Sequence, residues 1–180
     1  MKSRLTLLFL AVSFSALTAQ PSNLIARHPK VTYDWKPGFI SITELTGATG
    51  LGLTDYEFSK QYYGITTFAG YQFTRNIRIG AGAGIHIHNN GPLFPLYLDL
   101  RANLNSQAVV PFLAGSGGVM IDFTEFGDTR VFINPAVGIR YVAASRKAVT
   151  LQTGLMVTTG GPNERSSFIN IKIGIELKPR

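Results

Sequence analysis

The stretch IRIGAGAGIHIH, residues 77–88, alternates strictly between two kinds of side chain. One parity holds only aliphatic residues, and the other holds Arg78, three glycines, His86 and His88. Because every second side chain of a β-strand lies on the same face, the alternation predicts a strand with one apolar face and one polar face.

The same alternation recurs along the chain. It is clear in 94–105, 131–143, 148–159 and 167–178, and noisier in 38–52, 62–73 and 109–123. The register of 38–52 stays open, because turning Ile40 and Ile42 outward carries Glu44 outward as well. The eight candidate strands exceed the ~5–6 residues typical of soluble sheets and reach the ~9–11 that a membrane crossing needs.

The connections and the aromatic residues follow a second pattern. Short polar links at 74–76, 106–107 and 145–147 alternate with longer ones at 53–61, 88–93, 124–130 and 160–166, as in bacterial outer-membrane barrels. Aromatic residues near the strand ends predict two girdles at the membrane boundaries: Tyr71, Phe73, Phe112 and Tyr141 near short links, and Tyr62, Tyr63, Phe94, Phe123, Phe132 and Phe168 near long ones.

These patterns predict an all-β fold, an eight-stranded antiparallel up-and-down transmembrane β-barrel over residues 38–177. The aliphatic parity contacts lipid and the polar parity lines the lumen, and the barrel must close because an open sheet edge in hydrocarbon leaves amides unpaired. Gly80, Gly82 and Gly84 fit a lumen that is only wide enough for side chains. A soluble lipocalin-like periplasmic binding barrel is the alternative, and it requires the opposite orientation of the two faces.

The inward parity carries six charged residues: Arg78, Asp99, Arg101, Arg140, Lys172 and Glu176. Enclosed charges must pair or stay hydrated, so we expect an ion-pair network in which Asp99 and Glu176 bridge some of the four cations. Such a network is either a polar plug or a narrow selectivity element, and its positive excess would favour anions.

Residues 1–19 read as a cleaved signal peptide, with a basic start, an apolar run and small residues before the cleavage point. Residues 20–37 form a polar periplasmic lead-in, in which the role of Trp35 is open, and 178–180 form a C-terminal tail. The chain contains no cysteine, so disulfides and thiolate metal sites are excluded. Its 17 basic and 10 acidic residues give +7, or +5 without Lys2 and Arg4. The basic residues are scattered, which argues against nucleic-acid binding.

Three chemical readings of the motifs are weak. The glycines of GAGAG lie inside a strand and lack the spacing of a dinucleotide loop. His86 and His88 share a face, but without a third ligand nearby they are expected to be polar residues of the lumen or its rim, not a metal site. A lipid-modifying hydrolase could be drawn from either histidine with Ser116 and Asp99 or Asp122. We expect no catalytic residues, cofactor or metal.

The signal peptide, the eight amphipathic strands and the alternating links resemble the OmpA/OmpX-like outer-membrane β-barrel proteins of Gram-negative bacteria, often labelled "porin family". The resemblance is architectural and covers 38–177. It implies a monomer in the cell outer membrane with both termini in the periplasm. It also implies contact with outer-membrane lipid and lipopolysaccharide, and insertion by the barrel-assembly machinery. The expected role is a structural one, a surface interaction or minor solute passage.

Overall fold

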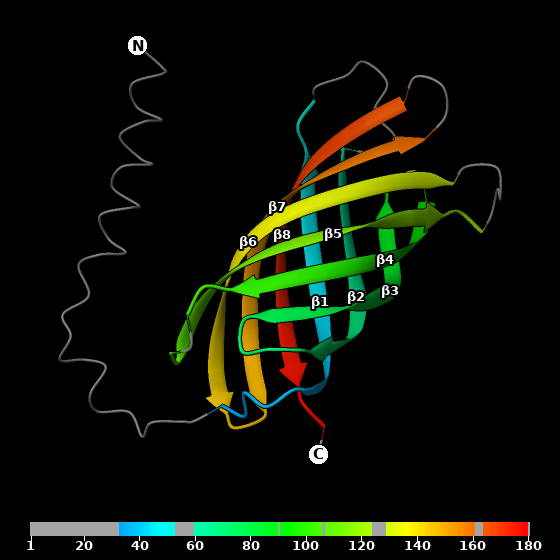
Figure 1. The fold of residues 1–180 in the computed structure, drawn as a ribbon. Coiled ribbons are helices and arrows are strands. Elements are labelled where there is room, and N and C mark those ends of the chain that lie inside the picture. Colours follow the sequence, from blue (N-terminus) through cyan, green and yellow to red (C-terminus); the bar gives the residue numbers. More distant parts are fainter. Residues whose placement is uncertain are drawn as a thin grey trace, which may run out of the picture. The chain divides into compact units, whose positions relative to one another are not determined.

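The computed structural model describes residues 33–52, 60–89, 91–105, 107–123, 129–160 and 164–179. They form eight strands: β1 (Gly38–Gly50), β2 (Gln61–Gln72), β3 (Ile77–His88), β4 (Gly91–Asn103), β5 (Val109–Ile121), β6 (Arg130–Ala144), β7 (Lys147–Gly160) and β8 (Glu164–Leu177). Each strand pairs antiparallel with the next, and β8 pairs with β1, so the sheet closes into a barrel (Figure 1). The predicted fold is confirmed.

No helix among the described residues is long and apolar enough to cross a membrane. The predicted signal peptide and the first part of the lead-in, up to residue 32, lie outside the described residues.

The two ends of the barrel differ. At one end β1 begins, β8 ends, and the strands are joined across 73–76, 104–108 and 145–146. We call this the turn end. At the other, which we call the loop end, the strands are joined across 51–60, 89–90, 122–129 and 161–163.

The loop-end connections are shorter than the sequence predicts in two places. β3 continues to His88 and β4 begins at Gly91, so the link expected over 88–93 has two residues. Gly91 adopts a φ of 133°, which a residue with a side chain rarely takes up. The link expected over 160–166 is reduced to 161–163. In both places the strand pairing extends into residues that composition alone marks as loop.

The outer face of the barrel is largely apolar, and most charged side chains of the strands lie on the inner face. On β4, Leu98 is 70 % exposed whereas its neighbour Asp99 is 3 % exposed. On β8, Ile175 is 59 % exposed whereas Glu176 is fully buried. A soluble binding barrel keeps its apolar residues inside, so the lipocalin-like alternative does not fit this structure.

The register of β1, left open by the sequence, turns its isoleucines inward. Ile40 and Ile42 are buried against Phe68 of β2, and Glu44 lies buried on the same face. The outer face of β1 carries the exposed residues Phe39 and Leu45, with small or polar residues between them. The lumen therefore accepts apolar and charged side chains side by side on one strand.

The girdle prediction is wrong for four aromatic residues that lie on the inward parity. Their side chains are buried in the lumen: Tyr62, Phe112, Phe132 and Phe168. Tyr63, Phe73 and Tyr141 are more than half exposed on the outer face, as expected. Phe39, which the sequence does not assign to a girdle, lies edge-on to Tyr71 with ring centroids 5.2 Å apart near the turn end.

The glycines of 77–88 fit a crowded lumen. A Cβ atom at Gly82 would overlap the ring of Tyr97, and one at Gly84 would overlap the backbone carbonyl of Ile65. These positions leave no room for a side chain, because the neighbouring strand or an opposing aromatic ring already fills the space.

Candidate functional site

The six charged residues predicted to face the lumen all lie inside it, each no more than 6 % exposed: Arg78, Asp99, Arg101, Arg140, Lys172 and Glu176. The structure brings five of them into two ion-paired clusters and leaves Lys172 outside both. It also adds Glu44, for which the sequence left the facing open.

The first cluster, which we call the turn-end triad, consists of Arg78, Arg140 and Glu176. Glu176 accepts a hydrogen bond from Arg78 across 2.6 Å, and Arg140 donates to both carboxylate oxygens across 2.6 and 2.9 Å. Arg78 also donates to the Asn103 side-chain oxygen across 2.7 Å. Two cations on one buried carboxylate leave this end of the lumen positively charged.

The second cluster consists of Glu44, Asp99 and Arg101. The Arg101 guanidinium lies 2.9 Å from a carboxylate oxygen of Glu44 and 2.9 Å from one of Asp99. The rings of Phe68 and Phe112 flank the same guanidinium, with centroids 5.3 and 5.9 Å from its central carbon, a distance that allows cation–π attraction.

A signal for Glu44 was present in the sequence. A carboxylate within a membrane-crossing strand is costly on the lipid face, and the four predicted lumen cations had only two predicted carboxylates. Both facts place Glu44 in the lumen, and that placement also settles the register of β1.

Lys172 belongs to neither ion-paired cluster. Its side chain is buried, and its ammonium lies 6.0 Å from the centroid of the Tyr97 ring. It makes no ion pair with any described residue. The expected bridging by carboxylates therefore reaches three of the four predicted cations.

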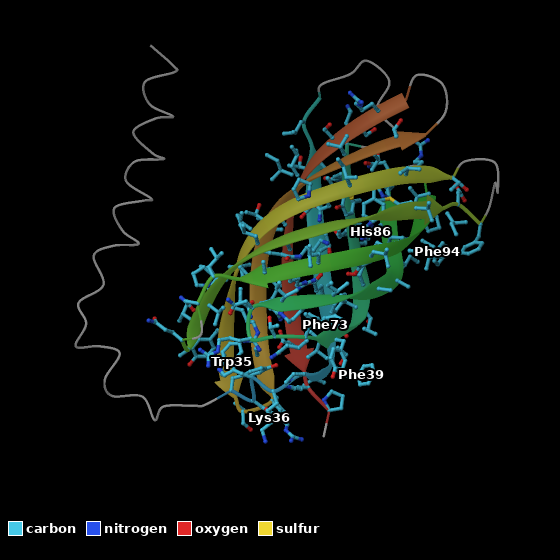
Figure 2. All side chains as sticks on the ribbon, in the orientation of Figure 1. Trp35, Lys36, Phe39, Phe73, His86 and Phe94 are labelled. Carbon is cyan, nitrogen blue, oxygen red and sulfur yellow. The ribbon has the colours of Figure 1, made fainter. Side chains whose placement is uncertain are left out.

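An apolar cluster occupies the lumen towards the loop end. It contains Tyr62, Leu93, Tyr97, Met120, Phe132, Met156 and Phe168. His86 and His88 stack on the ring of Tyr62, with centroids 4.7 and 4.8 Å away. Figure 2 shows His86 on the side of the barrel where Phe94 lies, away from Trp35 and Lys36. The two histidines thus lie inside the lumen, packed as flat rings against aromatic neighbours.

The residues of the hydrolase alternative do not converge on His86. Ser116 pairs in register with Asp99, which pairs with Gly80 of β3. His86 lies six residues further along β3, about 20 Å at ~3.4 Å per residue. A nucleophile and its base must lie within hydrogen-bond reach, so His86 and Ser116 do not form a catalytic pair.

The lumen offers little for a metal. Among the described residues there is no group of three or more histidine, cysteine, aspartate or glutamate side chains that could hold an ion. The carboxylates of both clusters face guanidinium groups instead. The chemical role of these ion-paired clusters is to occupy the lumen and to connect the strands around it.

No protein-family model matches this sequence, and no curated protein matches it. Solved structures do. The crystal structure of Neisserial surface protein A (NspA) matches with a TM-score of 0.58 and 15% identity, over 80% of this chain and 99% of that one. The likeness to NspA, added to the closed eight-stranded sheet, decides the fold. This chain has the fold of the small outer-membrane β-barrels.

Two further structures match with lower scores. The N-terminal β-barrel domain of Pseudomonas aeruginosa OprF has a TM-score of 0.48 and 15% identity, over 79% of this chain and 100% of that one. A de novo designed transmembrane β-barrel has a TM-score of 0.49 and 14% identity, over 80% of this chain and 98% of that one.

In a small outer-membrane barrel of eight strands the interior has room for side chains and little else. Here the ion-paired clusters lie towards the turn end, and the apolar cluster of aromatic and sulfur-containing side chains lies towards the loop end. Both regions of the lumen are occupied by the protein's own side chains.

Proposed function

We propose that this protein is a monomeric barrel of the Gram-negative outer membrane, with the turn end and both barrel termini on the periplasmic side. The carrying observation is the orientation of its faces: aliphatic side chains cover the outside of a closed sheet, and guanidinium and carboxylate groups are enclosed. Such a surface is stable in contact with lipid and lipopolysaccharide. Insertion by the barrel-assembly machinery follows from that location.

The role that fits this interior is structural or one of surface interaction, without catalysis. Ion pairs and the apolar cluster fill the lumen, so solute passage is at most minor. Interaction with other molecules then falls to the loop end, where the sequence places its longer links.

Fractionation and gel migration test the proposal. The protein is expected in the outer-membrane fraction, soluble only with detergent, and an unboiled sample is expected to migrate faster than a boiled one because the folded barrel survives. Purified protein in planar bilayers is expected to give no stable conductance step. Recovery as a soluble periplasmic protein would falsify the location, and a steady open pore would contradict the plugged lumen.

A further inference from the structure

Residues 33–36, which we call the strap, run across the turn end of the barrel before β1 begins (Figure 1). The amide of Asp34 donates to the carbonyl of Ser145, in the link between β6 and β7, across 2.8 Å. The side-chain amide of Gln72, at the end of β2, donates to the carbonyl of Trp35 across 3.0 Å. Because β2 and β6 lie on different sides of the closed sheet, the strap spans the mouth of the lumen.

The turn-end triad binds the two aromatic side chains of the strap. The hydroxyl of Tyr33 donates to Glu176 across 2.5 Å. The rings of Tyr33 and Trp35 lie 4.0 and 5.3 Å from the Arg140 guanidinium carbon and 5.0 Å from each other. Burial and the neighbouring Glu176 raise the pKa of Tyr33 above its usual value, so the hydroxyl keeps its proton and remains a donor.

Charged groups around the mouth of the lumen also bind the strap. The Asp34 carboxylate lies 3.8 Å from both the Arg146 guanidinium and the Lys178 ammonium. The Lys178 ammonium also donates to the backbone carbonyls of Asp34, across 2.7 Å, and of Lys36. The main chain of the strap is therefore bound as well as its side chains.

The strap covers otherwise unshielded charge. Arg78 and Arg140 lie at the turn end with no part of their side chains exposed, and Tyr33 is itself buried. At the mouth, the rings of Tyr33 and Trp35 lie over Arg140, the member of the triad that they cover.

We propose that the turn-end mouth is a binding site for the chain's own residues 33–36, which act as a plug that closes the lumen to water at this end and exposes its arginines when released. The chemical groups of residues 33–36 match those of the mouth. A hydroxyl reaches the carboxylate, two aromatic rings cover a guanidinium, and one acidic side chain meets the basic rim. The plug assigns a role to Trp35 that the sequence left open.

The docking of the plug can be followed by fluorescence because of the tryptophan content of the chain. Trp35 is its single tryptophan, so the fluorescence of the purified full chain in detergent micelles reports the strap alone. Tyr33→Ala is expected to shift the Trp35 emission to longer wavelength and to abolish its protection from acrylamide. Tyr63→Ala, the same change on the outer face, is expected to alter neither. Unchanged emission and quenching in Tyr33→Ala would overturn the proposal.

Solvent access is measured with single cysteines, since the native chain has none. Val110 is buried and pairs in register with Arg140. Val110→Cys is expected to resist a charged thiol reagent in the full chain and to react when Tyr33→Ala and Trp35→Ala are added. Met156→Cys, in the apolar cluster, is expected to resist in both backgrounds. Equal reactivity at position 110 in both backgrounds, or a parallel rise at 156, contradicts a local plug.

A variant that fails to fold is recognised by its unchanged migration on boiling. Tyr33→Phe then decides the outcome, because it removes only the hydroxyl that binds Glu176 and keeps the ring. It is expected to raise acrylamide quenching partway towards that of a free indole, and quenching identical to the native chain overturns the proposal. These measurements use purified protein, so they stand or fall separately from the proposed cellular location.

Discussion

Glu176 shows how a single carboxylate organises one end of the lumen. It accepts hydrogen bonds from Tyr33, Arg78 and Arg140, and none of its own side chain is exposed. Removing one partner of a buried ion pair is costly because the other charge stays buried without compensation. Here two guanidinium groups depend on the same anion.

Glu176→Gln is therefore expected to lower the free energy of unfolding by about 3–5 kcal/mol, the range found when a buried pair is broken. The measurement is urea-induced unfolding in detergent or lipid, followed by the loss of fast migration on unboiled gels. Lys147→Gln changes a charge on an exposed residue at the same end and is expected to leave the unfolding midpoint unchanged. Equal stability of Glu176→Gln and the native chain would contradict the triad.

Two glycines give a matched pair for testing how tightly the lumen is filled. A Cβ atom at Gly84 would overlap the backbone of Ile65, whereas one at Gly47, on the outer face, has no atom within 4 Å. Gly84→Ala is expected to cost about 1–3 kcal/mol of stability through overpacking, and Gly47→Ala is expected to be close to neutral. Thermal unfolding of the two variants checks this, and similar costs would mean that the lumen has spare room.

At the scale of the strand, the outward face was more predictable than the inward face, of which the sequence predicted the charged residues but not the apolar ones. Lipid favours apolar side chains, so strands such as β8 show an unbroken aliphatic row. The lumen accepts a phenylalanine as readily as an arginine, and its pattern carries little information. β1 has few aliphatic residues outside and two isoleucines inside, so its alternation points the wrong way until Glu44 is considered.

Leu98 and Leu104 test the lipid-facing row along one line of the barrel. Leu98 lies in the middle of β4 and is 70 % exposed, whereas Leu104 follows the last residue of β4 and is 61 % exposed. Leu98→Arg is expected to cost about 2–4 kcal/mol and Leu104→Arg about 0–1, since the penalty for a cation falls from the bilayer midplane to its boundary. Unfolding in lipid vesicles measures both, and equal costs would show that the two positions sit at the same depth.

For the whole molecule, the sequence predicted the barrel and most of the enclosed charges, but not how the ends of the lumen are occupied. Strand number, order and pairing follow from period-two alternation and the links between strands. The strap does not, because Tyr33 and Trp35 lie in no periodic segment and their partners Glu176 and Arg140 are distant in sequence. The apolar cluster does not follow from the sequence for a related reason, because the position of its aromatic residues near strand ends predicts girdles instead.

The contacts of the strap also imply an order of steps in the assembly of the barrel. Tyr33 precedes the first strand and Glu176 belongs to the last, 143 residues later. Their hydrogen bond cannot form before β8 has arrived beside β1, whichever route the earlier hairpins take. A docked Tyr33 therefore marks a barrel in which the last strand is already in place.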